Sequence, residues 1–134
     1  MKPASRDDLP LLFAGVEHRA WIIAVEDFLC GKRNTLPLSH HQCSFSAWLS
    51  GEGAAPHRDQ PAFQEILPLH QDLHQLANRL CGDRASLSAD VQRAGITILR
   101  SLRNELTEQL QILIVDSQRT ASEQELSNPA SDPY

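Results

Sequence analysis

Apolar residues recur every three or four positions along most of this chain, and this spacing predicts helices. The clearest segments run from about Asp8 to Cys30, from Pro61 to Gly82 and from about Ser88 to Asp116. A shorter segment covers about His41 to Leu49, and no segment carries a strong strand pattern. The sequence therefore predicts an all-α fold, a four-helix bundle with a short helix that carries a cysteine.

Capping residues mark the expected ends of these helices. Asp7 or Asp8 can cap the first helix, and Gly31 can end it. Ser86 or Ser88 can cap the last helix, whose apolar stripe is broad enough to contact more than one neighbour. That neighbour can lie inside the bundle or in a second copy of the chain, and we expect a homodimer.

Length and composition limit the organisation and the partners of the chain. Its 134 residues are one domain long, and we expect a folded domain over residues 8–118 and a disordered tail over residues 119–134, which lacks apolar content. The net charge of −5 argues against nucleic acid or an anionic membrane as a partner. No apolar run resembles a signal peptide or spans a bilayer, so we expect a cytoplasmic protein.

Three histidines fall on the inward faces of the predicted helices. His18 belongs to the stripe of the first helix, whereas His70 and His74 lie one turn apart on the third. A buried imidazole without a partner loses hydrogen bonds worth roughly 1–3 kcal/mol each. These rings therefore need either hydrogen-bonding neighbours in the core or a shared metal ion.

A cysteine near the start of the short helix can complete a metal site. Cys43 would add one sulfur to the three imidazole nitrogens, and zinc accepts this mixed set in a tetrahedron. Four protein ligands close the site, so we expect no hydrolytic chemistry and no enzyme activity. A lone buried cysteine is more often a small hydrophobic residue, and periodicity alone leaves both readings open.

The remaining histidines and cysteines are weaker candidates. His40, His41 and His57 fall in predicted loops, where we expect them to be solvated. Cys30 and Cys81 lie at helix ends and are expected to be free thiols, because an odd number of widely spaced cysteines does not suggest a disulfide framework.

Several short motifs, taken in order, resemble one known family. They are His18-Arg-Ala-Trp21, Cys43-Ser-Phe45-Ser-Ala-Trp48, Pro61-Ala-Phe63 and His70-Gln-Asp-Leu-His74. Over roughly residues 10–115 the chain resembles the chemoreceptor zinc-binding (CZB) domain family of bacterial signalling proteins. The resemblance implies a zinc ion held by His18, Cys43, His70 and His74, with Trp21 and Trp48 packed around it. Ser46 stands where the family usually has glycine.

The resemblance also suggests a function. In this family the domain is usually attached to chemotaxis receptors or to enzymes that make cyclic di-GMP, and metal occupancy regulates the attached output. We expect a stand-alone zinc-responsive protein, or the sensor part of something larger, that acts through a signalling partner. Zinc or oxidation of Cys43 would be the stimulus. Two alternatives are a haemerythrin-like di-iron bundle that binds oxygen and a metal-free helical adaptor.

Overall fold

The structure is a computed structural model that describes residues 8–35 and 43–127, with side chains described as far as residue 119. Within these residues the chain forms helices and no strands, which confirms the all-α prediction. Four α-helices, one of them the expected short helix, are accompanied by two 3₁₀ segments. In order they are α1 (Leu9–Leu29), α2 (Ser44–Ser50), η3 (Glu52–His57), α3 (Pro61–Gly82), η4 (Arg84–Ser86) and α4 (Ala89–Ser127).

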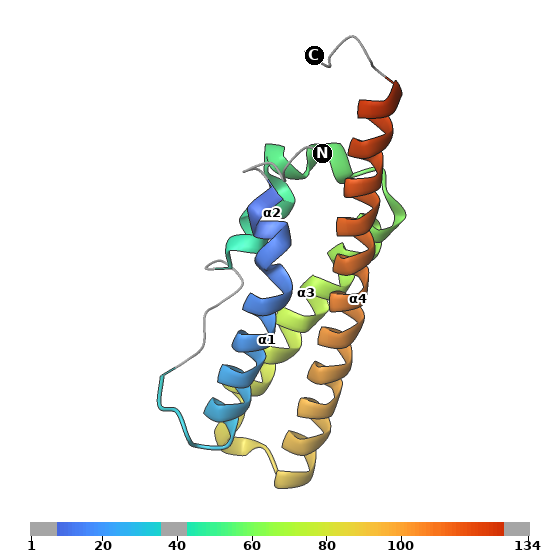
Figure 1. The fold of residues 1–134 in the computed structure, drawn as a ribbon. Coiled ribbons are helices and arrows are strands. Elements are labelled where there is room, and N and C mark those ends of the chain that lie inside the picture. Colours follow the sequence, from blue (N-terminus) through green and yellow to red (C-terminus); the bar gives the residue numbers. More distant parts are fainter. Residues whose placement is uncertain (1–7, 36–42, 128–134) are drawn as a thin grey trace.

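The three long helices run side by side, and α2 lies across the N-terminal half of α1 (Figure 1). The chain runs in the same direction along α1 and α3 and returns along α4. The last turns of α4 extend beyond the N-terminal end of α1 (Figure 1). No helix among the described residues is both long enough and apolar enough to cross a membrane.

Local signals fix the helix ends much as the sequence predicts. Gly31 has a positive φ of 81° and ends α1 in a Schellman motif, in which Lys32 N–H donates to the Asp27 carbonyl at 2.8 Å. Ser88 caps α4, because its hydroxyl accepts the Val91 N–H at 3.2 Å. Asp8 occupies the N-cap position of α1, but its side chain makes no capping hydrogen bond.

The core lies where α1, α2, α3 and α4 meet. On α4 the neighbouring apolar residues Ile98 and Leu99 differ, because Ile98 is 51% exposed and Leu99 is fully buried. Helix α4 packs against both α3 and α1, in agreement with the broad apolar stripe expected from its sequence. Gly95 allows a close approach there, since a Cβ atom would lie 2.7 Å from a Leu80 methyl carbon.

Helix α4 is longer than the apolar pattern indicates. We expected it to end near Asp116 and residues 119–134 to be disordered, but the helix continues to Ser127. Residues 118–126 are mostly good helix formers, and the next proline after α4 begins is at position 129, so intrinsic propensity favours a helix beyond Asp116. Residues 128–134 of the predicted tail lie outside the described part of the chain, and the domain boundary at residue 118 stays a prediction.

Candidate metal centre

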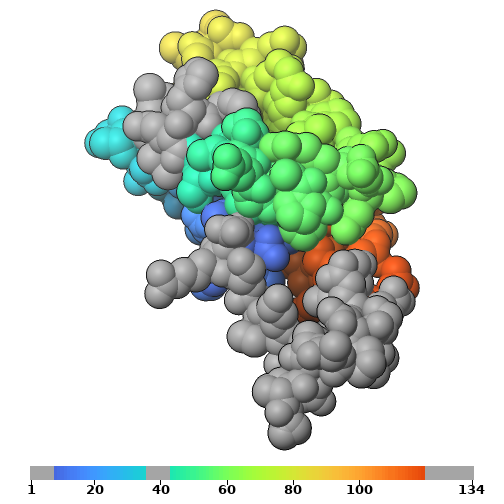
Figure 2. All heavy atoms as spheres, turned by 90° about the horizontal axis from the view of Figure 1, so that it is seen from above, coloured from blue at the N-terminus to red at the C-terminus, as the bar shows by residue number. Residues whose placement is uncertain are grey.

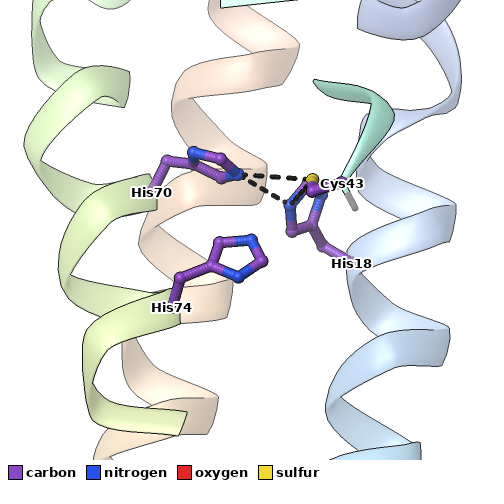
Figure 3. A group of neighbouring side chains, drawn as sticks. All are labelled: His18, Cys43, His70 and His74. Atoms are coloured by element: carbon purple, nitrogen blue, oxygen red, sulfur yellow. Dashed lines mark hydrogen bonds between the residues drawn. The ribbon is translucent and has the colours of Figure 1, made fainter. Parts of the chain in front are cut away.

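Four side chains from three helices converge inside the bundle (Figure 3). His18 projects from the middle of α1, His70 and His74 from one face of α3, and Cys43 lies at the N-cap of α2. Each residue offers one donor atom, and the four donor atoms all lie within 4.8 Å of one another. The three histidines are buried and Cys43 is half-buried, so the structure brings together all four residues that the sequence singled out.

The distances among three of the four donors fit a tetrahedral zinc ion. Arms of about 2.0–2.1 Å to nitrogen and about 2.3 Å to sulfur require nitrogens about 3.3 Å apart and nitrogen–sulfur separations of about 3.5 Å. The Nε2 atoms of His18 and His70 are 3.1 Å apart. The Cys43 Sγ atom lies 3.6 Å from each of these nitrogens. Three of the four donors therefore already have the spacing of a zinc coordination shell.

A hydrogen bond outside the cluster orients the His18 ring. Its Nδ1–H donates to the Ala14 carbonyl one turn earlier, at 2.7 Å. This bond leaves the Nε2 lone pair directed at the cluster, which is the tautomer that a metal ligand needs. The sequence reading did not anticipate this contact, although a helix always places the carbonyl of residue i−4 beside the side chain of residue i.

The electrostatics of the cluster favour a thiolate at Cys43 and an unprotonated imidazole at His70. Burial alone would raise the pKa of the Cys43 thiol, but hydrogen bonds with His18, His70 and His74 outweigh it and lower this pKa to about 2. Burial is the main cause that lowers the pKa of His70, and its hydrogen bond with Cys43 opposes the shift. A thiolate and an unprotonated imidazole are the forms that coordinate a metal ion.

Aromatic rings enclose the cluster and limit its contact with water. Trp21 packs against His74 with ring centroids 4.3 Å apart, as expected of a residue beside the metal. Phe45 makes T-shaped contacts with His18 and His70, with ring centroids 5.7 Å and 5.2 Å apart. Trp48 stacks on Phe45 at 5.5 Å and so forms a second layer behind it. The family resemblance had implied that the two tryptophans pack around the metal, whereas it assigned no role to Phe45.

Among the weaker candidates, His57 corrects the sequence reading. We expected it to be solvated in a loop, but it lies in η3 with 5% of its surface exposed. His40 and His41 lie outside the described residues. Cys30 is exposed, whereas Cys81 is half-buried and burial raises the pKa of its thiol. Neither of these cysteines belongs to the four-residue cluster.

The geometry defines a helical protein with a closed site of three histidines and one cysteine that is suited to zinc. Comparison with known families agrees: residues 18–81 match the model of the chemoreceptor zinc-binding domain, so the chain carries a CZB domain. All four cluster residues fall inside this match, which is shorter than the span of about residues 10–115 expected from the motifs and does not include α4. Searches of curated proteins and of solved structures gave no significant match.

Proposed function

We propose that this chain is a cytoplasmic, non-enzymatic regulatory domain that binds one zinc ion through His18, Cys43, His70 and His74. The observation that carries the proposal is the spacing of the Nε2 and Sγ donors, at 3.1 and 3.6 Å. A di-iron centre would need more ligands and bridging carboxylates, and the cluster contains no carboxylate from the described residues. The buried site also offers no open position for a substrate.

The regulatory action follows from where the ligands lie. His18 belongs to α1, Cys43 to the start of α2, and His70 with His74 to α3. Coordination by all four would join three helices, and the free energy of binding would add to the free energy of folding. Without the ion, α1 and α2 are held to α3 by packing and by the weaker hydrogen bonds among His18, Cys43 and His70, so a partner that contacts these helices would distinguish the two states.

Cys43 also gives the site a route to redox control. A peroxide attacked by the Cys43 thiolate would transfer one oxygen atom to sulfur, with cleavage of the O–O bond and release of hydroxide, or of an alkoxide from an organic peroxide. The resulting sulfenic acid is a poorer metal ligand than a thiolate. Oxidation would thus release the ion and produce the same loosening of α1 and α2 as a chelator.

The partner that we propose for the exposed face of α1 and α4 is a second copy of the chain. A groove of about 430 Å³ between α1 and α4 contains Arg19 and Arg103 beside apolar side chains. An adjoining depression that shares residues with this groove contains Glu108 and Asp116. A two-fold pairing would bring the carboxylates of one copy to the guanidinium groups of the other. The apolar side chains that would be covered are Leu12, Val16 and Ile114.

Matched cysteine variants test the zinc site. Cys43 and Cys81 are both half-buried, but only Cys43 lies in the cluster. We expect Cys43→Ser to weaken zinc binding at least tenfold in a competition assay with a chromophoric chelator, and Cys81→Ser to bind as the wild type does. Equal zinc affinity in all three proteins would refute Cys43 as a ligand. If none of the three proteins bound zinc measurably, the result would favour a metal-free adaptor.

A further inference from the structure

A fourth buried histidine, outside the metal cluster, joins three elements at the end of the molecule where α1 begins. His57, in η3, bonds through Nε2 to the Asp8 carboxylate at 3.0 Å and through Nδ1 to the Ser117 hydroxyl at 2.9 Å. A neutral ring satisfies both contacts when Nε2–H donates to Asp8 and Nδ1 accepts from Ser117. We call this set of three side chains the His57 clamp. Figure 2 looks onto this end, where α1, the η3–α3 segment and α4 lie together.

A continuous series of ring contacts connects this clamp to the zinc ligands. The His57 ring lies 5.6 Å from Trp48, and Trp48 stacks on Phe45 with an angle of 14° between the ring planes. Phe45 in turn contacts both His18 and His70. Phe45 and Trp48 belong to α2, the helix that Cys43 begins. Any shift of α2 that follows a change at Cys43 therefore reaches His57 through packed side chains.

The order serine–histidine–carboxylate resembles a hydrolytic triad, but its setting does not suit catalysis. Ser117 lies inside α4, where the backbone N–H groups donate to carbonyls one turn earlier and are not available as an oxyanion hole. The Asp8 side chain is only 25% exposed and the His57 side chain 7%. These three residues are better suited to holding the start of α1, η3 and α4 in one arrangement.

We propose that the His57 clamp couples the state of the metal site to the C-terminal half of α4. This inference rests on the proposed zinc function. It adds the contacts through which a structural change at the metal site would reach α4. Residue 117 lies 36 positions beyond the end of the family match at residue 81, so the clamp would connect the CZB domain to a helix outside it. When the metal is lost, α2 moves, the His57 ring shifts, and its bonds to Asp8 and Ser117 weaken.

Hydrogen exchange of the full chain, with and without zinc, tests the clamp. We expect zinc to slow exchange in peptides that cover residues 110–127 of the wild-type protein by at least threefold. His57→Phe keeps a ring beside Trp48 but removes both hydrogen bonds, and Ser117→Ala removes only one. In each variant the zinc-dependent difference should fall to less than half. Ser101→Ala, an exposed serine on the same helix, is the control and should behave as the wild type does.

Zinc stoichiometry, measured on the same samples, separates the two proposals. If the wild type binds no zinc, the metal function fails and the clamp fails with it. If all variants bind zinc and the exchange difference in α4 is the same in each, the clamp alone is refuted. The same conclusion follows if zinc never changes exchange in α4. Ser117→Ala keeps the test valid should His57→Phe fail to fold, because it removes only one hydroxyl group.

Discussion

The thermal stability of this chain should depend on free zinc with a slope that can be worked out beforehand. Above the dissociation constant, each tenfold rise in free zinc adds about 1.4 kcal/mol to the free energy of unfolding, provided that the unfolded chain binds weakly. Weak binding is expected because the ligands are spread over residues 18–74 and only His70 and His74 are neighbours in sequence. The full slope should therefore be observed.

The expected shift in melting temperature follows from the size of the folded part. About 110 described residues, at about 2.1 cal/mol/K each, give an unfolding entropy of about 230 cal/mol/K. The Tm should then rise by about 6 °C for every tenfold increase in free zinc. Circular dichroism at 222 nm, in buffers that set free zinc with a chelator, measures this rise. Magnesium over the same range should have no effect, because it prefers oxygen ligands.

A Tm that does not change with free zinc would refute this reasoning, since it would mean that the folded state binds no better than the unfolded chain. His70→Ala provides the matched control. This variant removes one ligand from the buried cluster and should flatten the dependence over the same range of free zinc. A slope as steep as that of the wild type would show that the metal binds elsewhere.

Two other substitutions test the local structure, and a matched pair of valine substitutions tests the proposed dimer face. Ser46→Ala should raise the free energy of unfolding by about 1 kcal/mol in urea denaturation, because the Ser46 hydroxyl oxygen is buried and makes no hydrogen bond among the described residues. Gly31→Ala should lower it by about 1–2 kcal/mol, since alanine is strained at a φ of +81°. Val16→Glu, on a side chain that is 72% exposed in the proposed dimer face, should yield monomers in light scattering, whereas Val91→Glu, at the far end of the molecule and 52% exposed, should not.

The convergence of the three cluster histidines can be predicted from the sequence because each lies in a strong local pattern. His18 replaces an apolar residue within a stripe, and the spacing of His70 and His74 places both rings on one helical face. Whether a residue lies on the apolar face of a helix depends on the residues three or four positions away, and these can be read directly from the sequence. The stop at Gly31 and the cap at Ser88 are local in the same sense, and both are confirmed.

The features that the sequence reading missed depend on distant residues. His57 is buried by contacts with Asp8 and Ser117, which lie 49 and 60 positions away in the chain, and no local pattern marks such a pair. The choice between Ile98 and Leu99 as the buried residue of α4 is decided by where α3 and α1 lie around it. Both residues are apolar, so the sequence alone allows either of them to face the core.

X-ray absorption at the zinc edge identifies the ligands of the metal site directly, because it reports the atoms around the metal in the purified protein loaded with one equivalent of zinc. We expect one sulfur at about 2.3 Å and three imidazole nitrogens at about 2.0–2.1 Å. The sulfur signal should disappear in Cys43→Ser and remain in Cys81→Ser. A shell of nitrogen and oxygen without sulfur in the wild type would contradict a centre built from His18, Cys43, His70 and His74.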